Sequence, residues 1–179
     1  MSLRSEETLE AFVDRITRNK KIMDILKLPT ILKTDSEQVI NKKRKMAIDK
    51  VIVKSSQEPT ELNKKFPEVE FDGIKYKNFG NIRLTVALMQ SIKMNSYLFG
   101  NPQVEMNIYY DNTEGVPFKL LDLLSDEFSG QDLEIKIDNE RQMIKEIKCE
   151  GITSQVAIIN NYERVGIRFS FYATLYKLK

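Results

Sequence analysis

The residue types that carry most enzyme chemistry are scarce in this chain. Its 179 residues include no histidine and one cysteine, Cys149. Without histidine there is no Ser-His or Cys-His pairing, and the most common general base and zinc ligand are missing. The pattern around Cys149 is that of a half-buried strand, which favours a packing thiol over a nucleophile. We therefore predict that the protein is not an enzyme and has no catalytic, cofactor-binding or metal-binding residues.

Carboxylates offer the one metal chemistry that this composition leaves open. Asp122 and Asp126 lie four residues apart in a segment with helical periodicity, and Glu127 follows them. This spacing places two carboxylates on one face of a helix, where they could share Mg²⁺. An amphipathic helix also directs carboxylates to solvent as a matter of course, and this second interpretation is favoured. A carboxylate-metal hydrolase is therefore the third of our functional hypotheses.

A dense group of cations forms a possible phosphate-facing basic patch, made of Lys42, Lys43, Arg44 and Lys45. Such a run is typical of surfaces that contact nucleic acid and of nuclear-localisation signals. Four consecutive residues spread around a helix, however, and no glycine-flanked aromatic residues lie beside them to stack on bases. A solvated helix face is the favoured interpretation. A basic nucleic-acid-binding module is the second functional hypothesis.

The bulk composition is typical of a soluble globular protein, with 41% hydrophobic and 30% charged residues. No apolar stretch approaches the roughly 18 residues that span a bilayer, and the first residues show no secretory signal. A single cysteine cannot form an internal disulfide, which suits a reducing cytoplasm. We expect a protein that is made in the cytoplasm and has no membrane partner.

Helical periodicity dominates residues 1–65. Apolar residues at i, i+3, i+4 and i+7 mark one face of a first helix: Leu9, Phe12, Val13 and Ile16. Ser5 can cap this helix, Pro29 ends a second apolar group, and Ser36 can cap a third helix that gives way to a strand near Val53. This part holds 15 basic and 10 acidic residues, a net charge of +5, whereas residues 66–179 hold 13 and 16, a net charge of −3. We predict that residues 1–65 are a helical N-terminal region or arm.

Residues 66–179 show the two-residue alternation of β-strands, interrupted by one helix. Asp72-Gly73 marks a tight hairpin turn, and the helix is expected to begin at Pro117 and to end at Gly130. Further strands are expected at residues 82–88, 104–110, 133–137, 143–149, 155–159 and 165–179. This order predicts an α+β fold, a mainly antiparallel sheet packed by helices, with residues 66–179 as the sheet domain.

The alternation of residues 165–179 continues beyond the length of an ordinary strand. At about 3.3 Å per residue the segment spans roughly 50 Å, whereas a domain of this length is about 40 Å wide. The expected neighbouring strands are about half as long, so part of the segment should pair with another subunit. The residues assigned to this subunit interface are Val165, Ile167, Phe169, Phe171, Tyr172 and Tyr176. The alternative is a long strand, bent at Gly166, that is wholly paired within a monomer.

Four segments of the second half carry a family resemblance: LTVALMQSIKMN, PQVEMNIYYDNTEG, VPFKLLDLLSDEF and RVGIRFSFYATLY. In the order of their predicted elements and in their general sequence pattern, over about residues 80–178, they resemble the tail-terminator and tail-completion (neck, connector) proteins of long-tailed bacteriophages and phage-tail-like particles. In that family a sheet with helices on one side forms the subunits of a ring, commonly a hexamer. The ring caps the tail tube and joins it to the sheath or head. Residues 1–65 are longer than the corresponding part of that family.

The resemblance implies a structural protein of the virion or phage-tail-like particle, assembled in the bacterial cytoplasm. Its partners would be other copies of itself in a ring, together with tail tube, sheath or head-connector proteins. Any DNA in the pore would make non-specific contact with the protein, and no cofactor is implied. A head-completion or baseplate component would show a similar pattern of elements.

Overall fold

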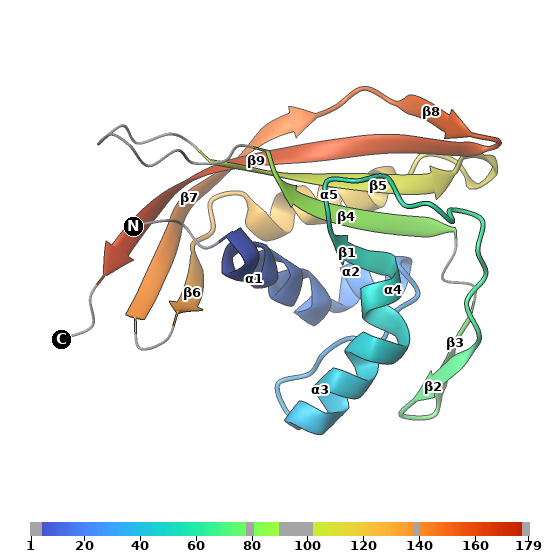
Figure 1. Cartoon of the computed structure of the whole chain (residues 1–179), viewed down its shortest axis with the longest axis horizontal. Coiled ribbons are helices and arrows are strands. Elements are labelled where there is room, and N and C mark those ends of the chain that lie inside the picture. Colours follow the sequence, from blue (N-terminus) through green and yellow to red (C-terminus); the bar gives the residue numbers. More distant parts are fainter. Residues whose placement is uncertain (1–4, 78–80, 90–101, 138–139, 177–179) are drawn as a thin grey trace.

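A curved seven-stranded sheet forms one layer of the protein, and helices cover one of its faces (Figure 1). The computed structural model describes residues 5–77, 81–89, 102–137 and 140–176. The helices are α1 (Ser5–Arg18), α2 (Lys20–Ile25), α3 (Glu37–Lys43), the π-helix η1 (Arg44–Ile48), α4 (Asp49–Val51), the 3-10 helix η2 (Asn112–Glu114) and α5 (Phe118–Phe128). The strands are β1 (Ile52–Lys54), β2 (Val69–Phe71), β3 (Ile74–Tyr76), β4 (Ile82–Leu88), β5 (Gln103–Asp111), β6 (Leu133–Ile137), β7 (Glu140–Ile152), β8 (Val156–Ile159) and β9 (Tyr162–Tyr176).

The main sheet is largely antiparallel. Its strand order is β1-β4-β5-β9-β7-β6, and β8 also pairs with β9. Among the described strand pairs, β1 and β4 alone run parallel. The β2–β3 hairpin is separate, and Asp72 and Gly73 at its turn have the positive φ angles of 52° and 75° that a primed turn requires. The predicted α+β class, with an antiparallel sheet packed by helices and a helical N-terminal region, is confirmed.

The helix boundaries follow from local chemistry. Ser36 caps α3, because its Oγ accepts a hydrogen bond from the backbone N–H of Val39 at 3.3 Å. Gly130, just after α5, has a φ of 72°, a conformation that glycine adopts without strain. Among the described residues, no helix is long and apolar enough to cross a membrane.

The main core lies between the helices and the sheet. Phe12 of α1 packs against Phe128 of α5, with ring centroids 5.0 Å apart, and against Phe171 of β9 at 5.8 Å. Phe128 also lies 5.4 Å from Phe169 of β9. One hydrophobic cluster thus joins both parts of the chain. The core thus draws on residues from both sides of the boundary predicted at residue 65, and α1 packs against the sheet because its apolar face is buried there.

A smaller apolar cluster lies on the opposite face of the sheet. It consists of Leu62, Tyr109, Tyr162 and the half-buried Ile158 of β8. The loop at residues 55–67 reaches this face. Arg83 holds it there, since Nη2 donates a hydrogen bond to the carbonyl of Glu61 at 2.8 Å and the guanidinium lies 4.5 Å from the ring centroid of Phe66. The loop therefore covers part of the face that the helices leave open.

Candidate assembly edge

The long strand β9 lies within the sheet. Its residues 162–170 pair with β5 on one side, and on the other side β8 pairs with residues 162–164 and β7 with residues 167–176. The expectation that its neighbours are half as long is wrong for β7, which has 13 residues. Among the described strands, none pairs with residues 172–176 on the β5 side. The part of β9 without a described partner on one side is therefore much shorter than the whole strand.

Four of the six residues predicted to form the subunit interface belong to the core of the single chain. These four side chains are at most 2% exposed: Val165, Ile167, Phe169 and Phe171. They face the helices, whose apolar residues already cover them. They therefore cannot supply the intersubunit contacts that the sequence predicted. The side chains of Tyr172 and Tyr176 lie outside the described residues.

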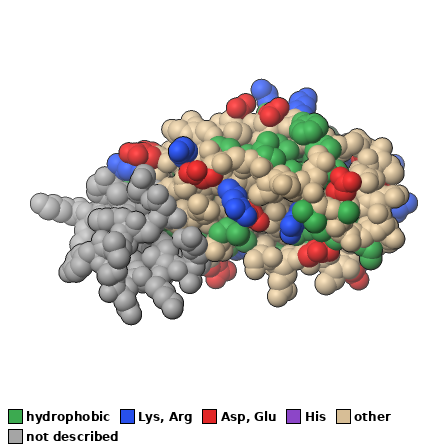
Figure 2. All heavy atoms as spheres, turned by 90° about the horizontal axis from the view of Figure 1, so that it is seen from above, with side chains coloured by type: hydrophobic (Ala, Val, Ile, Leu, Met, Phe, Trp, Pro, Cys, Tyr) green, Lys and Arg blue, Asp and Glu red, His purple; other side chains and the backbone are tan. Residues whose placement is uncertain are grey.

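The outer edge of β8 has no partner among the strands that the structure describes. This strand pairs with residues 162–164 of β9, and no other described strand pairs with it. Large exposed hydrophobic side chains lie on β8 and at the end of β7: Ile152 (55%), Val156 (39%) and Ile159 (59%). Seen from above, the molecule shows hydrophobic side chains at its surface (Figure 2). No charged residue lies between Glu150 and Glu163, and this uncharged run is the sequence signal that could have identified the edge.

Two hydrogen bonds between Thr153 and Gly166 fix the link between β7 and β8. The N–H of Thr153 donates a hydrogen bond to the carbonyl of Gly166 at 2.8 Å, and the N–H of Gly166 donates one to Thr153 Oγ1 at 2.8 Å. A Cβ atom at position 166 would lie 2.6 Å from Asn107 Oδ1 and 2.9 Å from Thr153 Oγ1. Glycine leaves space for this reciprocal pair. This link sets β8 along β9, and no other described strand covers the other side of β8.

The other described edge strands carry charged side chains. Lys54, at the end of β1, forms an ion pair with Glu10 at 2.8 Å. On β6, Glu134 pairs with Arg141 of β7 at 3.2 Å, and the β2–β3 hairpin is flanked by the ion pairs of Glu68. Charges on an edge strand discourage the addition of another strand. Charged residues are absent from β8 and also from residues 172–176 of β9, which have no described partner on the β5 side. We take β8 as the candidate assembly edge because its exposed apolar side chains are described.

The structure separates the cations that were predicted to form a phosphate-facing patch. Lys42 and Lys45 are exposed. Lys43 is buried, and its Nζ donates hydrogen bonds to the carbonyl of Thr30 at 3.0 Å and to Asp35 Oδ2 at 2.8 Å. Lys43 therefore does not share an exposed surface with Lys42 and Lys45, because the continuous turn of α3 and η1 directs successive side chains to different surroundings.

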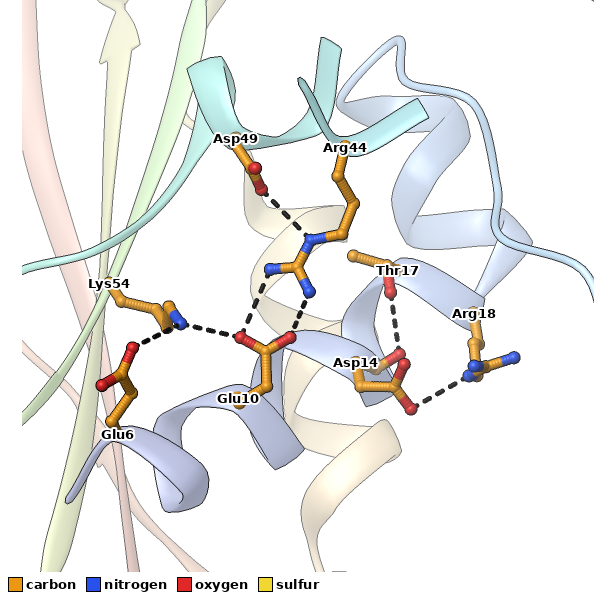
Figure 3. A network of polar contacts seen from close by, with 8 residues as sticks. All are labelled: Glu6, Glu10, Asp14, Thr17, Arg18, Arg44, Asp49 and Lys54. Atoms are coloured by element: carbon orange, nitrogen blue, oxygen red, sulfur yellow. Dashed lines mark hydrogen bonds and ion pairs between the residues drawn. The ribbon is translucent and has the colours of Figure 1, made fainter. Parts of the chain in front are cut away.

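Arg44, the fourth member of the predicted patch, belongs to an ion-pair network between η1 and α1 (Figure 3). Both Nη atoms of Arg44 donate hydrogen bonds to Glu10, and its Nε lies 3.3 Å from Asp49 Oδ1. Burial raises the pKa of Glu10, but the hydrogen bonds and charges of Arg44 and Lys54 outweigh burial and hold this pKa below its ordinary value. The hydrogen bonds and ion pair between Arg44 and Glu10 thus link η1 to α1.

The three acidic residues considered for a metal site have different surroundings. Asp122 and Asp126 are exposed on α5, whereas Glu127 forms an ion pair with Arg15 of α1. Within the part of the chain that the structure describes, no group of three acidic, cysteine or histidine side chains is placed to hold a metal ion. Cys149 is half-buried on β7.

Tyr110 on β5 carries a phenol with a strongly raised pKa. Burial and the hydrogen bond that it donates to Glu163 Oε2 at 2.7 Å raise the pKa of Tyr110 to about 12. Because this pKa exceeds the ordinary value of about 10, the stabilisation is complete below pH 10 and is lost as the pH rises towards 12. We expect Tyr110→Phe to remove the component that titrates near pH 12 from the tyrosinate absorbance, and an unchanged titration curve would contradict the assignment.

Comparison with known proteins adds no family to this description. No protein-family model matches the chain, and no curated protein matches it. A functional proposal therefore depends on the geometry of the edge and on the resemblance in element order described above.

Proposed function

We propose that this chain is a structural subunit of a homo-oligomeric ring at the end of a phage or phage-like tail, as a tail terminator or connector. It assembles with copies of itself and presents further surfaces to tube, sheath or head proteins. Its work in this proposal is mechanical and needs no catalytic residue.

The observation that carries this proposal is the uncharged edge of β8, which no other described strand covers. In an isolated chain this edge leaves backbone hydrogen-bonding groups and the side chains of Ile152, Val156 and Ile159 facing water. Burying a large aliphatic side chain completely contributes about 1.5–3 kcal/mol, so covering the partly exposed Val156 and Ile159 of β8 is favourable. Exposed apolar edges also promote uncontrolled aggregation unless a defined partner covers them. A protein built for assembly has such a partner.

The placement of the helices is a second support. Helices cover one face of the sheet, which agrees with the arrangement of ring subunits in the phage family that the second half of the chain resembles. The binding of nucleic acid through the basic run has less support, since Lys43 and Arg44 are held in ion pairs. Contact with DNA in a pore would draw on the remaining Lys42 and Lys45 of that run.

Multi-angle light scattering of the purified protein tests this proposal. We expect a mass above the 20.9 kDa of one chain, rising with protein concentration from about 1 μM to about 1 mM, because the edge contact is weak. The association should persist in high salt, since the contact is apolar, whereas binding through exposed lysines would be screened. A mass of one chain across this whole range would contradict the proposal.

A further inference from the structure

We propose that residues 55–65 form a strap that opens as a unit over the intact sheet and uncovers the surface of Arg83, Tyr109 and Tyr162 beneath it. The strap lies between β1 and the β2–β3 hairpin and crosses the face of the sheet that carries Tyr109 (Figure 1). Its opening requires no association between copies of the chain, so it is independent of the proposed function.

Few contacts hold the strap closed. Leu62 is the one buried residue of residues 55–65, 4% exposed in the apolar cluster with Tyr109 and Tyr162. The strap forms no helix or strand, and its described backbone–backbone hydrogen bonds all join near neighbours in the sequence. One aliphatic side chain therefore provides most of its apolar contact. A segment held in this way separates at a lower free energy than the one that unfolds the whole protein.

Arg83 of β4 is the polar anchor of the strap, and it is weaker than an ion pair would be. Its Nη2 donates hydrogen bonds to the carbonyls of Glu61 at 2.8 Å and Lys64 at 3.4 Å. The side chain belongs to a residue that is 6% exposed, and its Nε is buried without a hydrogen-bond partner among the described residues. Burial lowers the pKa of Arg83, because two carbonyls compensate a buried guanidinium less completely than a carboxylate does. Opening returns this charge to water, which offsets part of the contact that is lost.

Both ends of the strap are fixed, which confines the motion. Lys54, at the end of β1, pairs with Val86 of β4, and Phe66 packs against the main core. The helices and the sheet can therefore stay folded while residues 55–65 move. The surface that opens contains an arginine and two tyrosines, residue types that are enriched where proteins contact one another.

Thiol labelling tests whether the opening is local. In a Cys149→Ser background, Leu62→Cys places a thiol under the strap, and Val86→Cys places one in the main core, where Val86 is fully buried. We expect a maleimide to react with Leu62→Cys at least about 100-fold faster than with Val86→Cys, and low urea concentrations to accelerate chiefly the second reaction. Equal rates, or rates that rise together with urea, would show that the strap opens only when the protein unfolds.

Trypsin cleavage after the exposed Lys64 tests the anchor in a chain whose Leu62 is intact. We expect Arg83→Ala to raise the cleavage rate at least about threefold, because it removes both hydrogen bonds to the strap and enlarges the open fraction. Arg168→Ala is the matched control, since Arg168 also lies in the sheet but donates its hydrogen bond to Glu105. Its cleavage rate should equal that of the unmodified chain. Equal rates for the two variants would overturn the role of Arg83, and circular dichroism verifies that both fold.

Discussion

Replacement of Phe128 by alanine should lower the free energy of unfolding by about 3–5 kcal/mol. The Phe128 side chain is fully buried, and its ring lies 5.0 Å from that of Phe12 and 5.4 Å from that of Phe169, measured between centroids. Alanine would leave a cavity where α1, α5 and β9 meet, and the surrounding backbone cannot collapse far enough to fill it. Urea denaturation followed by circular dichroism measures the loss.

Phe118→Ala is the matched control for this substitution, because Phe118 lies on the same helix and is 60% exposed. It should change stability by less than about 1 kcal/mol. Because the N-terminal helices share the core of the sheet, Phe128→Ala should also unfold in a single transition at lower denaturant concentration. A cost below about 1 kcal/mol at Phe128, or a first transition that leaves the helices of residues 5–54 folded, would contradict the shared core.

Lys43→Met should lower the free energy of unfolding by about 3 kcal/mol at neutral pH. The Lys43 side chain is 3% exposed and that of its partner Asp35 is 10% exposed. Methionine retains the packing of the lysine stem but removes two hydrogen bonds, to Asp35 and to the carbonyl of Thr30. Asp35 would keep its hydrogen bond from the backbone N–H of Leu32, at 2.8 Å, and would lose its cation. Chemical denaturation at several pH values measures the effect.

The pH dependence of the stability loss tests whether the Lys43–Asp35 ion pair is its cause. Burial raises the pKa of Asp35, but the hydrogen bonds from Lys43 and Leu32 and the lysine charge outweigh burial and hold this pKa below its ordinary value. A lowered pKa stabilises the fold above the ordinary value of about 3.9, and this contribution disappears as the pH falls through the lower value. The stability difference between the unmodified chain and Lys43→Met should therefore shrink below about pH 4.

Two further variants complete the experiment. Lys42→Met, at the exposed neighbouring position, should leave stability within about 0.5 kcal/mol of the unmodified chain. Asp35→Asn added to Lys43→Met should recover part of the loss, because it removes the uncompensated buried charge. Equal effects of Lys42→Met and Lys43→Met would show that the Lys43 contacts contribute nothing.

Local signals in the sequence determined most of the element boundaries. The helical face that contains Phe12, the cap at Ser36 and the Asp72-Gly73 turn each depend on residues within a few positions of one another, and the structure has all three. The strand at residues 133–137 was predicted with the bounds that it has. The strand predicted at residues 143–149 proved longer, because irregular pairing between Lys145 and Gly151 interrupts the alternation on which its ends were judged.

For the candidate site too, some features follow from local sequence and others only from the tertiary structure. Alternation along β9 showed two faces, but the tertiary structure decided that its apolar residues meet helices and that β7 pairs with residues 167–176. A run of cations likewise does not reveal that Asp35 lies beside Lys43. The sequence by itself determined the helices, the strands and the uncharged run around β8, because local hydrogen bonding and side-chain periodicity set these features. The tertiary structure alone decided which described edge has no described partner, because strand pairing joins residues far apart in the chain.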